Sequence, residues 1–173
     1  MNLKKTIRSI PDWPIPGVVF RDLTTLMQDP EAFKHSCDIL FQRYCDKAID
    51  KIVGIDARGF VFGGVLAYKL GIGFIPVRKV GKLPFRIIQE NYDLEYGTDT
   101  LEIHQDSIIP GEKVVIVDDL IATGGTVGAT VKLVRKLGGD IVECAFIVEL
   151  PDLKGREQIA GCPVFSMVAF EGE

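Results

Sequence analysis

The hydrophobic and polar positions of this chain follow two patterns in turn along most of its length. Short apolar runs predict buried strands, whereas apolar residues three or four positions apart predict helices. Strands are predicted at residues 51–55, 74–77, 101–104, 114–117, 141–150 and 164–168. Helices are predicted at residues 3–10, 29–46, 59–70, 127–137 and 152–159. Because strands and helices alternate, we expect an α/β domain with a parallel core sheet flanked by helices on both faces.

Two segments fit neither pattern. Residues 11–16 contain three prolines, which favour an extended segment after the first predicted helix. Residues 78–100 are polar, contain glycine and show weak periodicity. A stretch of about 20 residues without regular structure is uncommon inside a compact domain unless it is functional or disordered. We therefore expect residues 78–100 to be a functional or disordered loop, although residues 85–88 are more apolar than an exposed loop usually is.

Composition limits the classes of protein to consider. The 173 residues suit a single domain, 47% of them are hydrophobic, and the net charge is −4. An acidic chain without a long basic run argues against nucleic acid as the main partner. No apolar stretch is long enough to span a bilayer, and residues 1–10 lack the apolar segment of a signal peptide. We expect a cytoplasmic protein that binds no membrane.

The four cysteines form no Cys-x-x-Cys pair, and the two histidines are not spaced as zinc ligands beside them. Cys37 and Cys45 fall on the apolar face of the helix predicted at 29–46, and Cys144 lies in a predicted strand. We therefore expect the cysteines to be small, reduced core residues.

Residues 114–126 carry the strongest functional signal. A buried strand runs directly into Asp118 and Asp119. In parallel sheets, ligands bind beyond the carboxyl ends of the strands, so these carboxylates are expected at the mouth of a site. Carboxylates repel a phosphate, but they suit the hydroxyls of a sugar diol or a hydrated magnesium ion.

The loop that follows the aspartates suits the opposite kind of group. Gly124 and Gly125 let the backbone turn tightly and approach a ligand. Backbone N–H groups in such a turn, at the positive end of a helix, bind anions, and Thr123 and Thr126 add hydroxyl donors. A phosphate beside a diol describes a ribose 5-phosphate. The loop contains neither a Walker A sequence nor a Gly-x-Gly-x-x-Gly fingerprint. The plain alternative is a strand–turn–helix connection with a solvated Asp-Asp cap.

A second candidate loop follows the strand predicted at 51–55. Its Arg58 can pair bidentately with phosphate oxygens, so it is a candidate clamp for pyrophosphate. The alternative is a surface arginine that pairs with Asp56. Lys79 and Lys82 at the start of residues 78–100 are further candidates, or else merely solubilising charges.

Residues 114–126 resemble the phosphoribosyl pyrophosphate (PRPP) motif of the type I phosphoribosyltransferases. Further segments, in the same order and spacing, resemble those of family members that act on adenine. These segments are residues 16–23, 54–60, 78–84, 94–97 and 101–104. The resemblance covers roughly residues 5–170, nearly the whole chain.

The resemblance implies one type I phosphoribosyltransferase-like domain over residues 1–173, with a small hood at residues 1–30 and a flexible lid at residues 78–100. It implies transfer of the phosphoribosyl group of PRPP to N9 of adenine, which gives AMP and pyrophosphate. Mg²⁺ would be held through PRPP and water, with no ligand directly from the protein. The family also implies a homodimer.

The resemblance assigns roles to individual residues. Glu95 would take or share the proton lost from adenine, and either role stays open. Phe20 and Leu120 would stack on the two faces of adenine, while the backbone of Val19 and Arg21 would bind the purine edge. The remaining contacts to PRPP would come from Asp118 and Asp119 on the ribose, Ala122, Thr123, Gly124, Gly125 and Thr126 on the 5′-phosphate, and Arg58, Lys79 and Lys82 on the pyrophosphate.

Two alternative functions remain open from the sequence. The first is the same reaction on another purine base: hypoxanthine, guanine or xanthine. The second is a non-catalytic regulator that senses PRPP. A regulator of this kind would need a surface for DNA or RNA, but this acidic chain has no basic stripe and no spare domain.

Overall fold

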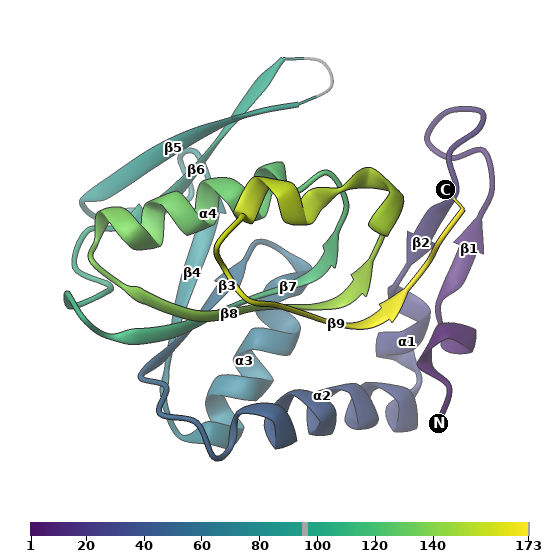
Figure 1. The fold of residues 1–173 in the computed structure, drawn as a ribbon, viewed down its shortest axis with the longest axis horizontal. Coiled ribbons are helices and arrows are strands. Elements are labelled where there is room, and N and C mark those ends of the chain that lie inside the picture. The colour runs from purple at the N-terminus through teal and green to yellow at the C-terminus, as the bar shows by residue number, and fades with distance from the viewer. Residues whose placement is uncertain (95–96, 173) are drawn as a thin grey trace.

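A computed structural model describes residues 1–94 and 97–172 of the chain (Figure 1). Its main sheet has seven strands in the order β5-β6-β4-β3-β7-β8-β9. The five strands from β4 to β9 in that order are parallel, whereas β6 and β5 extend the sheet antiparallel at one edge. The strands are β3 (Lys51–Ile55), β4 (Gly73–Lys79), β5 (Ile87–Asp93), β6 (Thr98–His104), β7 (Lys113–Ile121), β8 (Asp140–Glu149) and β9 (Val164–Ala169).

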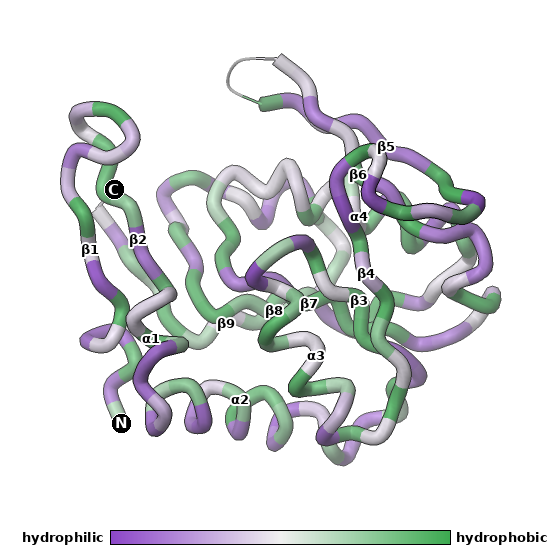
Figure 2. The backbone as a smooth tube through the Cα atoms, turned by 180° about the vertical axis from the view of Figure 1, so that it is seen from behind, coloured by the Kyte–Doolittle hydropathy of each residue, from purple (hydrophilic) through white to green (hydrophobic). Residues whose placement is uncertain are grey.

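Helices cover both faces of this sheet, as expected. Helices α2 (Pro30–Tyr44) and α3 (Arg58–Leu70) pack on one face, and α4 (Gly125–Lys136) packs on the other (Figure 1). In β7, Val115 and Val117 belong to the α2–α3 side of the core, while Val114 and Ile116 belong to the α4 side. Since both faces of the strand are covered, its residues form a continuous apolar run, and the inner strands are correspondingly hydrophobic in Figure 2.

Local signals place the ends of α2 and α3. The Asp29 side chain accepts hydrogen bonds from the backbone N–H groups of Glu31 and Ala32, both at 3.0 Å, and Pro30 opens the helix. Gly71, with φ of +68°, ends α3. Cys37 and Cys144 are buried as expected, whereas Cys45 lies one residue beyond α2 and is exposed, so its placement in the core was wrong.

The helix predicted at residues 3–10 is not formed. A 3₁₀-helix, η1 (Leu3–Thr6), leads into strand β1 (Arg8–Ile10), which pairs antiparallel with β2 (Phe20–Asp22) in a separate two-stranded sheet. A short helix, α1 (Thr24–Gln28), follows β2. The apolar spacing of Leu3 and Ile7 did signal burial, since both are buried. Pairing with β2, ten or more residues away in the chain, gives this segment its extended form.

Residues 78–100 are also more regular than expected, because β5 and β6 form an antiparallel hairpin that runs alongside α4 (Figure 1). The half-buried Glu90 of β5 pairs with Lys132 and Lys136 of α4, at 3.4 and 2.5 Å. A carboxylate on the inward face hides the alternating pattern that would have predicted this strand. Within the described residues, no helix is long and apolar enough to cross a membrane.

The segment predicted as a helix at residues 152–159 contains two shorter 3₁₀-helices, η2 (Pro151–Leu153) and η3 (Gly155–Ile159). Lys154 separates them in a left-handed conformation, with φ of +55°. The left-handed residue interrupts the helical backbone, so a continuous helix cannot form there.

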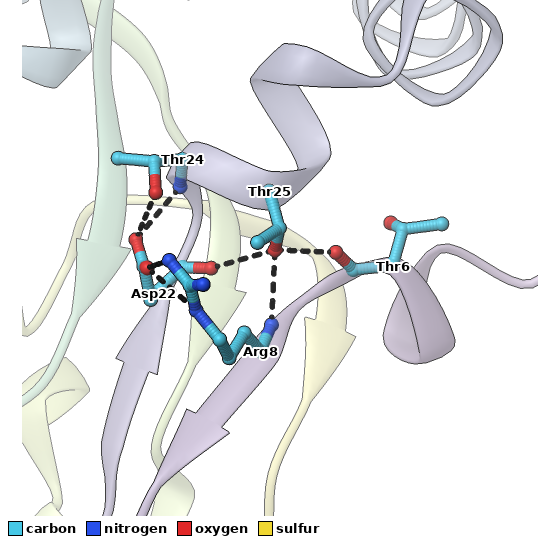
Figure 3. Close-up of polar contacts among 5 residues, drawn as sticks. All are labelled: Thr6, Arg8, Asp22, Thr24 and Thr25. Carbon is cyan, nitrogen blue, oxygen red and sulfur yellow. Dashed lines mark hydrogen bonds and ion pairs between the residues drawn. The ribbon is translucent and has the colours of Figure 1, made fainter.

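Asp22 joins the three N-terminal elements through its carboxylate (Figure 3). Arg8 of β1 donates to Oδ2 through Nη2 at 2.5 Å and Nε at 3.1 Å. The backbone N and the hydroxyl of Thr24 donate to Oδ1 at 2.9 and 2.5 Å. Thr25 accepts from the backbone N of Arg8 at 3.1 Å and donates to the carbonyl of Thr6 at 2.7 Å. The bonds from Thr24 and Arg8 lower the pKa of Asp22 to about 2.

We therefore expect Asp22→Asn to lower the free energy of unfolding at pH 7, by about 1–3 kcal/mol for a lost hydrogen bond to a charged group. A carboxylate whose pKa is depressed in the folded state stabilises the protein above its unfolded pKa, and this contribution fades as the pH falls toward the folded pKa. The difference from the unaltered chain should thus shrink between pH 5 and about pH 2. Urea unfolding over this range measures it, with the exposed Asp46→Asn as control. A difference that is constant with pH would contradict the assignment.

Candidate active site

A cavity of about 510 Å³ opens at the carboxyl ends of β3, β4 and β7. It brings together eight of the residues that the sequence predicted for a site: Arg58, Lys79, Asp118, Asp119, Leu120, Ala122, Gly124 and Thr126. They come from three separate strand ends, and the parallel register of β3 with its neighbours places those ends at one edge of the sheet.

The two aspartates form the acidic side of this cavity. Asp119 is buried and pairs with the guanidinium of Arg58, while Asp118 is half-buried and accepts from the backbone N of Asp119 at 2.8 Å. Burial, together with the negative charge of Asp119, raises the pKa of Asp118 well above its usual value. Burial is the largest single influence and lowers the pKa of Arg58, but the charge and hydrogen bond of Asp119, together with the charges of Asp118 and Asp22, outweigh it, so the net shift is upward. A group with hydroxyl donors or positive charge beside Asp118 would relieve this repulsion.

Arg58 therefore pairs with Asp119, and not with Asp56, the partner that its position in the sequence suggested. Asp56 pairs with Arg78, at 3.0 Å from the guanidinium Nε to the carboxylate, and not with Arg58. Arg58 reaches across to β7 because α3 begins close to that strand. A Cβ atom on Gly59 would lie 2.7 Å from the carbonyl oxygen of Val117 and 3.0 Å from the carboxylate of Asp118. Only glycine lets the helix start at this distance.

The loop after the aspartates ends at the start of α4. Gly124 is the N-cap residue, with φ of +84°, and supplies no side chain to bond the N–H groups of the first turn. Those donors are the part of a helix that binds anions. Thr123 and Gly125 line a second cavity, of about 260 Å³, on the side toward β5. The loop thus divides its residues between two adjoining cavities.

Tyr92 of β5 lines both cavities and was missed by the sequence analysis. Its hydroxyl donates to Asp99 of β6 at 3.1 Å, and Asp99 also pairs with Lys79 at 2.7 Å. Burial raises the pKa of Tyr92. Ile88, Glu90 and Tyr92 share the half-buried face of β5, but the charged Glu90 interrupts the apolar alternation that would have marked this face in the sequence.

Most of the residues predicted to contact the base do not line the first cavity. Of these residues, Leu120 lines the first cavity, whereas Val19, Phe20 and Arg21 do not. Phe20 is half-buried at the start of β2, with the edge of Trp13 against it at 4.5 Å between ring centroids. The guanidinium of Arg21 lies 4.1 Å from the ring centroid of Phe170. The negative charge of Asp22, which ends β2, contributes to the raised pKa of Arg58.

Two further predictions fall outside the cavity. Lys82 is exposed and does not line it. Glu95 lies outside the described residues. Within residues 1–94 and 97–172, no cluster of three or more His, Cys, Asp or Glu side chains is arranged to hold a metal ion.

The strand–loop–helix unit that builds this cavity is found in a known class of enzymes. Residues 22–168 match the family described as phosphoribosyl transferase domain. A parallel sheet with an acidic pair and an uncapped helix N-terminus at its carboxyl edge thus defines a phosphoribosyltransferase.

Relatives over the full length specify the class further. The adenine phosphoribosyltransferase of Desulfosudis oleivorans is 62% identical over 173 residues, which is 100% of both chains. The crystal structure of adenine phosphoribosyltransferase from Thermoanaerobacter pseudethanolicus has a TM-score of 0.92 and 47% identity, over 97% of this chain and 98% of that one. The enzyme from Trypanosoma brucei, in complex with AMP, pyrophosphate and ribose-5-phosphate, has a TM-score of 0.89 and 30% identity, over 96% and 78%. The chain belongs to the adenine phosphoribosyltransferase family.

Proposed function

We propose that the cavity transfers the 5-phosphoribosyl group of PRPP to N9 of adenine, a purine salvage reaction that gives AMP and pyrophosphate. The observation that carries this proposal is the meeting, in one cavity, of an acidic pair, an arginine and an uncapped helix N-terminus. These are the groups that a sugar diol, a pyrophosphate and a 5′-phosphate require. The Trypanosoma brucei relative was solved with AMP, pyrophosphate and ribose-5-phosphate, which carry the same groups.

The ribose and its phosphate are assigned to the β7–α4 unit. Asp118 and Asp119 accept hydrogen bonds from the ribose hydroxyls. Residues 122–126 hold the 5′-phosphate, with backbone N–H groups at the start of α4 and the hydroxyls of Thr123 and Thr126 as donors.

The pyrophosphate leaving group is assigned to basic residues outside the β7–α4 unit. Arg58 binds pyrophosphate oxygens through its guanidinium, and Lys79 adds a point charge from the end of β4. Lys82, exposed on the segment before β5, reaches the pyrophosphate when the hairpin closes. Lys79 then exchanges its ion pair with Asp99 for the more highly charged pyrophosphate.

Magnesium fits this donor set through the substrate. The carboxylates of Asp118 and Asp119 are hard oxygen donors beside the place where the diol binds, and the raised pKa of Asp118 indicates a site that favours added positive charge. The ion would be held by PRPP oxygens and water, and it supplies charge neutralisation for the departing pyrophosphate.

The base is assigned to the β2 side of the cavity. Leu120 packs on one face of adenine and Phe20 on the other, and the backbone of Val19 and Arg21 binds the purine edge. Glu95 takes or shares the proton lost from N9 as it attacks C1′. Since this transfer passes through an oxocarbenium-like state that water would intercept, residues 78–100 act as a lid, and residues 1–30 as a hood.

Two broader properties belong to the same proposal. Val61 and Tyr68 are seven residues apart on one face of α3, with exposures of 40% and 88%, and this apolar stripe fits a homodimer contact. Light scattering should then give about twice the chain mass of 19.1 kDa, and a monomer would contradict it. All four cysteines are free thiols, which fits a cytoplasmic location. Fractionation that found the protein in an oxidising compartment would contradict that location.

A pyrophosphate-release assay tests the function. Purified protein with PRPP and magnesium should release pyrophosphate with adenine and form AMP, but should release none with hypoxanthine, guanine, xanthine, uracil or orotate. Release of pyrophosphate with another purine would agree with the assignment of the PRPP contacts but would overturn the assignment of the adenine contacts. Tight binding of PRPP without release from any base would favour a regulator instead.

Glu95→Gln tests the proton-transfer role. The amide cannot accept the proton, so turnover should fall by roughly 10²–10⁴-fold if Glu95 is a general base. Single-turnover kinetics with adenine and PRPP measures this, and Glu90→Gln on β5, which pairs with α4 instead of lining the first cavity, is the matched control. Near-normal turnover in Glu95→Gln would leave Glu95 at most a hydrogen-bonding partner of the purine.

A further inference from the structure

The backbone of the phosphate loop, residues 122–126, rests directly on the backbone at Gly155, the first residue of η3. A Cβ atom on Gly155 would lie 2.3 Å from the carbonyl oxygen of Ala122 and 3.1 Å from the backbone N of Gly124. The contact is reciprocal, since a Cβ atom on Gly124 would lie 2.3 Å from the carbonyl oxygen of Gly155. No side chain fits between the two segments, because the nearest neighbour on each side, at 2.3 Å, is a backbone oxygen, which cannot rotate away.

The segment that carries Gly155 is itself anchored to the sheet. Arg156 donates to both carboxylate oxygens of Glu149, the last residue of β8, at 2.6 Å each. Ser166 of β9 donates to the same carboxylate at 2.6 Å. Glu149 is buried, and bonds from Arg156 lower its pKa despite that burial. A buried carboxylate with a bidentate guanidinium and a hydroxyl is a geometrically defined anchor.

A left-handed residue leads the chain into η3. Lys154, at φ of +55°, turns the backbone immediately before Gly155. Further along η3, the carbonyl oxygen of Gln158 would lie 3.4 Å from a Cβ atom on Gly128 of α4. The segment therefore packs along the start of α4, just behind the donors of its first turn.

The phosphate loop has few means of its own to hold its shape. Gly124 provides no capping side chain, and Ala122 and Gly125 have no polar side-chain atoms. Anion binding by backbone donors depends on their being held in place before the ligand arrives. The rigid surface against this loop is the backbone at Gly155.

We propose that Gly155 is a positioning residue for the 5′-phosphate, held in place by the Arg156–Glu149 pair. Gly155 touches no substrate and acts by supporting the backbone of residues 122–124. This inference rests on the proposed function, in that residues 122–126 bind the 5′-phosphate. A side chain at position 155 displaces the loop and weakens binding of the 5′-phosphate. The binding of adenine, which carries no phosphate, is unaffected.

Gly155→Ala tests the proposal. A displacement of the loop by about 1 Å should raise the KM for PRPP and the Kd for AMP by about 10- to 100-fold. The KM for adenine should stay within about twofold, because it depends on contacts at the other side of the cavity. Gly73→Ala is the matched control, since a Cβ atom at the first residue of β4 would meet only the flexible side chain of Lys51, at 3.5 Å or more. Steady-state kinetics measures the KM for PRPP and for adenine, and calorimetry measures the Kd for AMP.

A second variant covers the case in which Gly155→Ala does not fold. Arg156→Lys keeps the charge beside Glu149 but loses the bidentate pair, so the same phosphate-specific defect should appear in weaker form. If the KM for adenine and the Kd for AMP rise equally in the folded variants, the role of Gly155 is a general structural one and the inference is overturned. So would a normal Kd for AMP in Gly155→Ala. An unaltered chain that neither binds AMP nor turns over adenine would instead overturn the proposed function itself.

Discussion

The burial of β7 between two layers of helices is the constraint on which the rest of the structure depends. Its residues at 114–117 alternate between the α2–α3 side and the α4 side of the core, and all four are fully buried. Because this run is held on both faces, the next two residues of β7, Asp118 and Asp119, take a fixed position toward the carboxyl edge of the sheet. The contacts to PRPP proposed for Arg58 and for residues 122–126 are placed relative to these aspartates, by α3 on one side and by α4 on the other.

Electrostatic strain at this edge is concentrated in one pair of carboxylates. Asp119 is compensated by its ion pair with Arg58, whereas Asp118 forms no ion pair within the described residues and its pKa is raised. Lys79, which also lines the cavity, is paired with Asp99. PRPP, the substrate proposed above, has hydroxyl donors for the aspartates and a pyrophosphate for the basic residues, so both kinds of charge match one molecule.

Close approach of backbones gives the site its shape. Gly59 lets α3 begin against β7, and Gly155 lets η3 rest against the phosphate loop. In both places a single methyl group would meet a backbone oxygen at under 3 Å. Neither role is visible in the sequence, because glycine in a chain with 18 of them marks no particular contact. The partner oxygens belong to residues more than thirty positions away.

The sequence by itself determined the elements whose signals are local. The apolar run into Asp118 and Asp119, the capped start of α2 at Asp29 and the glycine-bearing loop before α4 depend on neighbours in the chain, and the structure has them where predicted. Tertiary structure alone decided the features that need distant partners. Residues 8–10 form a strand because they pair with β2. Residues 87–93 form a strand because they pair with β6 and because Glu90 forms ion pairs with the lysines of α4. Arg58 took Asp119 instead of Asp56 because α3 lies against β7, and spatial neighbours of this kind leave no local pattern to read.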